Sequence, residues 1–124
     1  MQTYYKRYDI RKMDINEIDQ VLLSNEYLID LRSETEFKEG RIPNSINVPF
    51  LFIKDWAKNI RSYHSRIYLY CQNGARSVLA ASILKKSGFI DVVDIGGLNA
   101  YKGRLVTDKD WNNIIRGNRK CQKQ

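Results

Sequence analysis

Residues 67–84 of the chain read Ile67-Tyr68-Leu69-Tyr70-Cys71-Gln72-Asn73-Gly74-Ala75-Arg76-Ser77-Val78-Leu79-Ala80-Ala81-Ser82-Ile83-Leu84. An apolar run of β-forming residues stops at Cys71, a short polar loop follows, and a helical pattern starts at Ser77. This order predicts a strand, a loop and a helix, with a thiol at the carboxyl end of the strand. Backbone N–H groups of such a loop and of the first helical turn lower the pKa of a thiol and favour a nucleophile. The alternative is an inert core cysteine, since cysteine is often buried.

Strand-like and helix-like segments alternate along the rest of the chain. The predicted strands are Tyr5–Ile10, Tyr27–Leu31, Ile46–Val48, Ile67–Tyr70 and Val92–Ile95. The predicted helical segments are Asp14–Leu23, a turn within 32–40, a segment within 50–61, Ser77–Lys86, Leu98–Tyr101 and Asp108–Ile115. The alternation predicts an α/β fold, with a mostly parallel central sheet flanked by helices on both faces. Ligands of such sheets bind beyond the carboxyl ends of the strands, where Cys71 and the run Asp30-Leu31-Arg32 lie.

Three local patterns make sharper predictions. Asp14, followed three residues later by Glu17, has the form of a capping box at a helix start. The helix over 77–86 is apolar nearly all round, so we expect it to be buried against the sheet. The pair Gly96-Gly97 predicts a sharp break after the last strand, and the polar, basic segment from Gly117 onwards predicts a frayed end.

The composition predicts one soluble domain over residues 1–124, with a core over about 5–116 and a basic tail over 117–124. No run approaches the roughly 18 apolar residues that span a bilayer, and the first residues lack a signal peptide's apolar segment. We therefore expect a cytoplasmic protein without membrane association. The net charge of +7 either aids solubility or attracts anionic substrates or an acidic partner. The scattered basic residues carry no nucleic-acid-binding motif, so nucleic acid is not an expected partner.

The cysteine and histidine content limits other chemistry. With only Cys71, Cys121 and His64, the chain offers neither a disulfide framework nor a recognisable set of metal ligands. No metal and no cofactor are therefore expected. His64 is expected in a surface loop, and Cys121 is expected to be an exposed bystander in the basic tail.

Several blocks in order resemble the rhodanese-like sulfurtransferases. The run Leu28-Ile29-Asp30-Leu31-Arg32, with Glu36-Phe37, Gly40, Ile42-Pro43 and Ser45-Ile46-Asn47-Val48-Pro49, is similar to the first signature of the family. Tyr70–Ser77 resembles its active-site loop, and Gly88-Phe89, Val92 and Ile95-Gly96-Gly97-Leu98 resemble its closing motif. The likeness runs from about Asp14 to Tyr101. It departs at Arg41, where the family often has histidine, and at Asn44, where glycine is common.

This resemblance implies a single rhodanese-like domain in which Cys71 is the nucleophile. Cys71 would take a sulfane sulfur from a small anionic donor such as thiosulfate, or from a persulfide, and hold it as a persulfide. It would then pass the sulfur to a thiol, to a thioredoxin-like acceptor or to cyanide. A relay of the sulfur from Cys71 to Cys121 is an alternative.

The length of the loop favours sulfur over phosphate. Cys71 and Arg76 are separated by four residues, whereas cysteine phosphatases use Cys-x5-Arg to cradle a tetrahedral phosphoryl group. In the wider kinship of the family, the six-residue loop goes with sulfur and the seven-residue loop with phosphate or arsenate. The alternatives are a sulfur-carrier or partner-recognition module without turnover of its own and, less favoured, a phosphatase or arsenate reductase.

The expected site consists of Cys71 as the catalytic residue and a binding loop of Gln72, Asn73, Gly74, Ala75, Arg76 and Ser77. Gln72, Asn73 and Ala75 contribute mainly N–H groups, and Gly74 permits a positive φ. Arg76 either attracts an anionic donor or forms a structural ion pair. Ser77 binds the thiolate or caps the helix. Asp30 and Arg32 are expected to support the scaffold, with Arg32 pairing to Glu36 and Asp30 orienting the loop.

Overall fold

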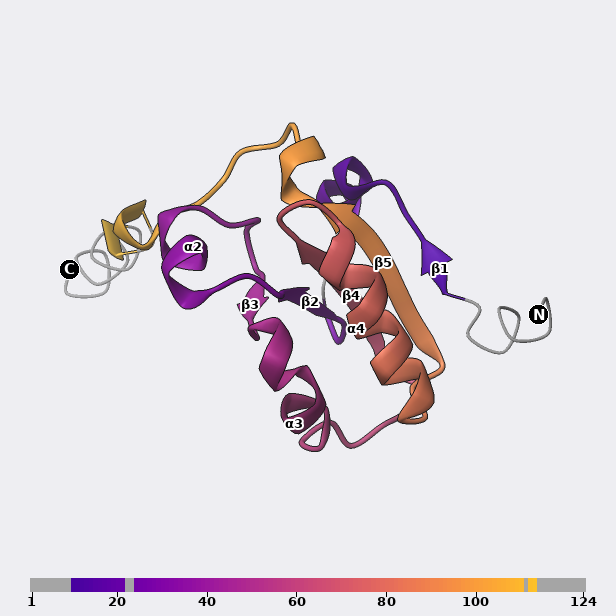
Figure 1. Ribbon diagram of the computed structural model, residues 1–124. Coiled ribbons are helices and arrows are strands. Elements are labelled where there is room, and N and C mark those ends of the chain that lie inside the picture. Colours follow the sequence, from indigo (N-terminus) through magenta and orange to yellow (C-terminus); the bar gives the residue numbers. More distant parts are fainter. Residues whose placement is uncertain (1–9, 22–23, 111, 114–124) are drawn as a thin grey trace.

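The computed structural model describes residues 10–21, 24–110 and 112–113. In this part of the chain a sheet of five strands has the order β1-β5-β4-β2-β3, and every neighbouring pair is parallel (Figure 1). The strands are β1 (Arg11–Lys12), β2 (Tyr27–Asp30), β3 (Ile46–Asn47), β4 (Arg66–Cys71) and β5 (Asp91–Gly97). The α-helices are α2 (Glu34–Glu39), α3 (Ile53–Ala57) and α4 (Ala75–Lys86), and the 3₁₀ helices are η1 (Ile15–Gln20), η2 (Phe50–Phe52) and η3 (Leu98–Ala100). The predicted fold class is confirmed.

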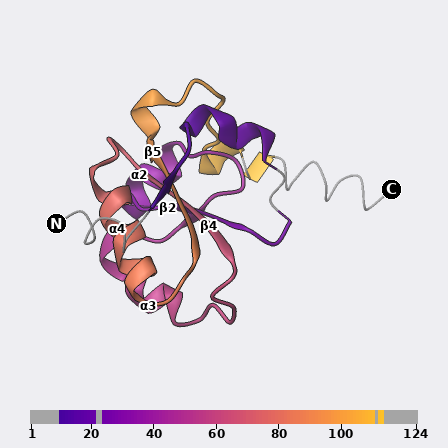
Figure 2. The same ribbon diagram turned by 90° about the vertical axis from the view of Figure 1, so that its right-hand side faces the viewer.

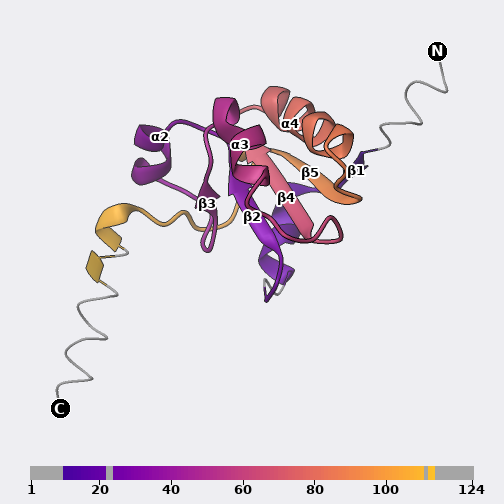
Figure 3. The same ribbon diagram turned by 90° about the horizontal axis from the view of Figure 1, so that it is seen from below.

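Alternate side chains of the strands enter two separate cores, as the period of two in a strand requires. On one face, Ile67 and Leu69 of β4 pack with residues of α3 and α4. On the other face, Tyr68 and Tyr70 pack with residues of η1 and η3. Figures 2 and 3 show α3 and α4 together on one side of the sheet. Helical segments therefore cover both faces, as predicted.

The central strand β4 carries the thiol. Its neighbours are β2 and β5, and Cys71, its last residue, lies beside Gly97 of β5. The register shifts between Leu69 and Tyr70, and the strand β5 continues through Gly96 and Gly97. The predicted break at these glycines is therefore wrong, because the irregular register absorbs the positive φ of Gly96 within the strand.

The N-terminal elements differ in detail from the prediction. Residues 5–9 of the first predicted strand lie outside the described part, and β1 follows directly after Ile10. The next helix is a single 3₁₀ segment, η1, rather than a helix to residue 23, of which residues 22–23 are not described. The Asp14 side chain caps η1 by accepting from the N–H of Asn16 at 2.8 Å, so the predicted capping box with Glu17 is wrong.

The helix α4 is longer and less buried than predicted. It begins at Ala75 rather than Ser77. Ala80, Ala81 and Leu84 are fully buried against the sheet, but the side chain of Leu79 is 54% exposed. The prediction that this helix is buried against the sheet is confirmed for one face of α4, and Leu79 shows that its apolar residues do not all lie on that face.

The segment after η3 returns across the end of α2. Arg41 and Val106 form an antiparallel bridge with two backbone hydrogen bonds of 2.9 and 2.8 Å. The Arg41 guanidinium binds Asp108 at 2.6 Å and lies 4.5 Å from the centre of the Phe37 ring. We call residues 105–108 the return segment. The return segment therefore binds Arg41, which lies two residues after the end of α2.

The C-terminal prediction is tested only in part. Residues 108–110 and 112–113 are helical, and residues 111 and 114–124 are not described, so the end of the predicted helix over 108–115 and the basic tail lie outside the described residues. Among the helices that the structure does describe, none has both the length and the apolar character needed to span a membrane.

Candidate active site

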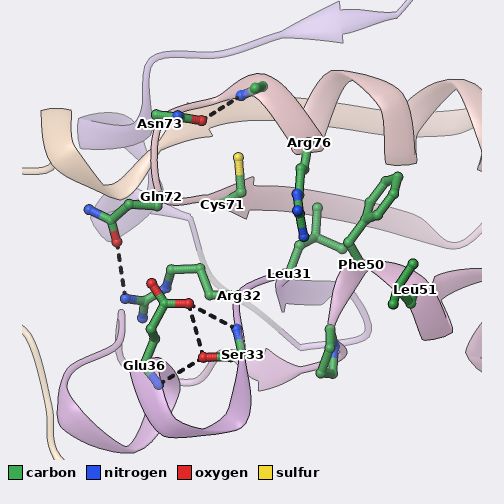
Figure 4. Close-up of a pocket in the computed structure, with 12 residues that line it drawn as sticks. Leu31, Arg32, Ser33, Glu36, Phe50, Leu51, Cys71, Gln72, Asn73 and Arg76 are labelled. Carbon is green, nitrogen blue, oxygen red and sulfur yellow. Dashed lines mark hydrogen bonds between the residues drawn. The ribbon is translucent and has the colours of Figure 1, made fainter.

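A cavity of about 470 Å³ opens beyond the carboxyl ends of β2 and β4 (Figure 4). Four segments line it: the end of β2 with the start of α2, the turn entering η2, the loop after β4, and the first turn of α4. Its lining residues are Leu31, Arg32, Ser33, Glu36, Pro49, Phe50, Leu51, Cys71, Gln72, Asn73, Ala75 and Arg76. The chain therefore brings together two strand ends that lie about 40 residues apart in sequence, as the parallel sheet predicts.

The Cys71 thiol lies at the base of this cavity. The residue is 3% exposed, and its Sγ accepts a hydrogen bond from the N–H of Gly74 at 3.0 Å. Gly74 has a φ of +90°, which turns the loop back over the sulfur. The helix α4 starts at the next residue, so its N-terminal N–H groups lie close to the thiol. The Gly74 N–H and the start of α4 are therefore backbone groups close in sequence to the thiol.

The loop between Cys71 and α4 is anchored at several points. The Asn73 side chain accepts from the N–H of Ala75 at 3.0 Å, and the Gln72 carbonyl accepts from the N–H of Asn99 at 3.1 Å. The backbone of Asn73 packs directly on Gly97, where a Cβ would lie only 2.6 Å from the Asn73 carbonyl carbon. The strand β5 therefore supports the loop from behind.

A buried polar network lies between the loop and α2. The Arg32 guanidinium binds Asp30 with a shortest distance of 2.8 Å, and it also donates to the Gly40 carbonyl and to Gln72 Oε1, the latter at 3.4 Å. The Tyr70 hydroxyl donates to Asp30 at 2.7 Å. Arg32 therefore connects β2, α2 and the thiol loop. The predicted pairing of Arg32 with Glu36 is wrong, because Asp30 is the bound carboxylate.

Burial and the neighbouring charge of Asp30 shift the pKa values of Arg32 and Tyr70. Burial lowers the pKa of Arg32, but the hydrogen bonds and negative charge of Asp30 outweigh burial and leave that pKa raised. Burial, and then the charge of Asp30, raises the pKa of Tyr70 well above its ordinary value. Both groups keep their protons at neutral pH. The guanidinium and the hydroxyl therefore remain donors to Asp30.

Arg76 of α4 and Glu36 of α2 are two charged side chains that line the cavity from different helices. Arg76 is exposed, with its guanidinium 5.7 Å from the centre of the Phe50 ring, and forms no ion pair with any described carboxylate. Glu36 lies on the α2 side. Hydrogen bonds from the Ser33 backbone and hydroxyl hold its pKa below the usual value. Arg76 is therefore available to an anion near Cys71, and the proposed structural ion pair for it is absent from the described residues.

Three of the predicted residues, Gly74, Ser77 and Asp30, do not line the cavity. Ser77 is fully buried, and its hydroxyl donates to the Gly74 carbonyl at 3.1 Å. It neither binds the sulfur nor caps α4, whose N-cap is Gly74. Asp30 is fully buried behind Arg32, consistent with a supporting position. Sequence reasoning did not assign six of the lining residues to the site: Leu31, Ser33, Glu36, Pro49, Phe50 and Leu51. The Ser33–Glu36 capping box is nevertheless visible in the sequence.

The described residues contain no group of three or more His, Cys, Asp and Glu that would hold a metal ion. His64 is exposed in a loop, as predicted, and lies away from the cavity. Cys121 lies outside the described residues. The lining of the cavity includes the Cys71 thiol and the guanidinium groups of Arg32 and Arg76.

The fold and the cavity together define a class of protein: a parallel α/β domain that presents a cysteine loop at the end of its central strand. The sequence model of the rhodanese-like domain family matches residues 13–104. The chain belongs to the rhodanese-like domain family, and the predicted resemblance is confirmed.

The chain is similar to proteins of other organisms, and it spans less than two thirds of the length of several of them. The chain is 36% identical over 83 residues to the Bacillus subtilis protein YqhL, a match that covers 66% of this chain and 65% of that protein. It is 30% identical over 95 residues to a sulfurtransferase of Allochromatium vinosum, covering 70% of this chain and 88% of the relative. A solved Escherichia coli rhodanese with anions superimposes with a TM-score of 0.60 at 26% identity, covering 66% of this chain and 98% of that one.

Proposed function

We propose that the chain is a sulfurtransferase that moves a sulfane sulfur through a persulfide on Cys71. The observation that carries the proposal is the position of Sγ at the base of the cavity, 3.0 Å from the N–H of Gly74, in a loop that leads into a twelve-residue helix. A persulfide is small and anionic, so converging N–H groups are sufficient to hold it.

The two half-reactions need only a donor and an acceptor. In the first, the Cys71 thiolate attacks the outer sulfur of a donor such as thiosulfate. The new S–S bond forms as the old one breaks, and sulfite leaves with the electron pair. In the second, an acceptor thiolate attacks the outer sulfur of the persulfide, and the Cys71 thiolate leaves with the electron pair of the broken bond. The chain ends each cycle in its starting state.

The residues around Cys71 have separate roles in this proposal. Arg76 attracts the anionic donor, because its guanidinium reaches the cavity without a carboxylate of its own. The Gly74 N–H donates to the sulfur, and in this proposal the other backbone N–H groups of the loop that are not already bound hold the outer sulfur of the persulfide. Arg32 and Asp30 keep the loop in place through Gln72. They act as positioning residues.

Intact-mass spectrometry after incubation with thiosulfate tests the proposal. We expect the Cys121→Ser chain to gain the mass of one sulfur atom and the Cys71→Ser chain to gain none. Subsequent addition of cyanide should remove the sulfur as thiocyanate. Equal sulfur uptake by the Cys71→Ser chain, or none by the Cys121→Ser chain with thiosulfate, glutathione persulfide and a cysteine-desulfurase persulfide, would refute the proposal.

Two further assays distinguish the proposed sulfurtransferase from a sulfur carrier and from a phosphatase. A chain that gains sulfur but releases it only to one protein acceptor is a sulfur carrier. Cys71-dependent turnover of an aryl phosphate would support a phosphatase instead, against the six-residue length of the loop.

A further inference from the structure

Three large apolar side chains are exposed on η2 and α4, the two elements that supply Phe50, Leu51, Ala75 and Arg76 to the cavity. Leu51 is 82% exposed and Phe52 is 58% exposed, both in η2, and Leu79 of α4 is 54% exposed. Phe50, the residue before Leu51, is partly buried and packs instead against the core. We call Leu51, Phe52 and Leu79 the rim patch.

The two parts of the rim patch belong to one surface. Arg76 of α4 lies over the Phe50 ring, so the first turn of α4 contacts η2. Leu79 is three residues after Arg76 and four after Ala75, and both of these line the cavity. Residues at these spacings share one face of a helix. Leu79 therefore lies on the face of α4 that carries Ala75 and Arg76. Leu51 lines the cavity from η2 (Figure 4).

Positive charge borders the rim patch. Arg76 lies beside it, and Lys54 is exposed one helical turn after Leu51. Neither forms an ion pair with a described carboxylate. On the opposite rim, Glu36 is held by its cap and Glu34 by Lys38 at 3.0 Å. Arg76 and Lys54 therefore give the apolar side of the mouth cationic groups that no described carboxylate pairs with.

We propose that the rim patch is the docking surface for a protein that carries the exchanging thiol on an acidic, apolar loop. This inference deepens the proposed function, since it names the class of partner that reaches Cys71. The thiol enters the cavity, an apolar side chain covers Leu51 and Phe52, and a carboxylate meets Arg76 or Lys54. A small donor such as thiosulfate covers none of the rim patch, so its exposed apolar area is explained only by a larger partner.

Disulfide exchange tests the surface without requiring a persulfide. The probes are two synthetic peptides, Asp-Glu-Leu-Cys-Leu-Gly and Lys-Lys-Leu-Cys-Leu-Gly, each as its mixed disulfide with thionitrobenzoate. The Cys71 thiolate of the Cys121→Ser chain attacks the peptide sulfur. A new disulfide forms, and coloured thionitrobenzoate leaves with the electron pair. We expect the acidic peptide to react about tenfold faster at low salt, with the difference shrinking as salt rises.

Substitutions outside the cavity test whether the faster reaction of the acidic peptide depends on the rim patch and on Lys54. Phe52→Ser, Leu79→Ser and Lys54→Glu should each slow the reaction of the acidic peptide about threefold or more, while leaving exchange with 2-mercaptoethanol disulfide unchanged. Ile90→Ser is the matched control, because Ile90 is equally exposed, at 56%, but lies beyond the far end of α4. Equal rates for the two peptides, or patch variants that behave like Ile90→Ser, would overturn the proposal.

Two further measurements address other occupants of the rim patch. Sedimentation equilibrium should give a monomer whose mass does not change in Phe52→Ser. Co-sedimentation with vesicles of anionic phospholipid should show no binding that depends on Leu79. Dimerisation or vesicle binding through these residues would overturn the partner class. The exchange assay needs only the thiol of Cys71 and no sulfane sulfur. If the Cys121→Ser chain takes up no sulfur from thiosulfate, glutathione persulfide or a cysteine-desulfurase persulfide but keeps its preference for the acidic peptide, the proposed function is refuted and the docking surface is not.

Discussion

Replacing Gly97 by alanine should displace the loop that carries the thiol. A Cβ at this position would lie 2.6 Å from the carbonyl carbon of Asn73 and 2.7 Å from its Cα, where ordinary contacts begin at 3.4 Å. The Asn73 backbone must therefore move by about 0.8 Å to restore an ordinary contact. The φ of Gly97 is −110°, which alanine adopts freely, so the clash is the whole effect.

Two readouts follow from this displacement. Overpacking against backbone lowers the free energy of unfolding by about 1–3 kcal/mol, which urea denaturation measures. The shift also separates the Gly74 N–H from Sγ, now 3.0 Å apart. Loss of one hydrogen bond to the charged sulfur should slow alkylation of Cys71 by iodoacetamide about tenfold. The measurement uses the Cys121→Ser chain.

Gly96→Ala is the matched control. Gly96 has a φ of +93°, but a Cβ there has nothing within 4 Å. This variant should lose about 1–2 kcal/mol from backbone strain and keep the alkylation rate of the parent chain. If Gly97→Ala unfolds at the same urea concentration as the parent and its thiol reacts at the same rate, the reasoning about support from β5 is wrong.

Two further predictions concern α2 and its network. Tyr70→Phe should lower the free energy of unfolding by about 1–3 kcal/mol, because it removes a buried donor to Asp30; a urea midpoint equal to that of the parent would contradict this. Ser33→Ala should cost about 1 kcal/mol at neutral pH through loss of the cap. Because the pKa of Glu36 is lowered by Ser33, the contribution of its carboxylate is complete above the usual value of 4.5 and is lost as the pH falls through the lowered value. The difference between parent and variant should therefore narrow in urea titrations at about pH 3, and a gap that widens there would contradict the assignment.

The parts of the fold that the sequence predicts are those fixed by local pattern. The run from Ile67 to Leu84 contains the strand, the turn at Gly74 and the helix in one continuous stretch, so little depends on distant residues. The continuation of β5 through Gly96 and Gly97 could not be seen in this way. It depends on the register with β4, which only the folded sheet defines.

Within the site, one missed contact was available in the sequence and another was not. Asp30 and Arg32 are two residues apart at the end of a strand, so their side chains leave the same face and can pair. The period of two therefore favours Asp30 over Glu36 as the partner of Arg32. By contrast, Phe50 and Leu51 reach the cavity only because β3 places the chain beside β2. No spacing within the sequence predicts that approach.

The return segment determines where a shortened chain can end and still keep the cavity intact. The family match ends at residue 104, whereas Val106 and Asp108 hold Arg41 at the end of α2. A chain trimmed at residue 104 would keep all the described strands but would release that end of α2. The Gly40 carbonyl that binds Arg32 would lose its fixed place. The shortest fragment that preserves the cavity therefore extends at least to Asp108, four residues beyond the end of the family match.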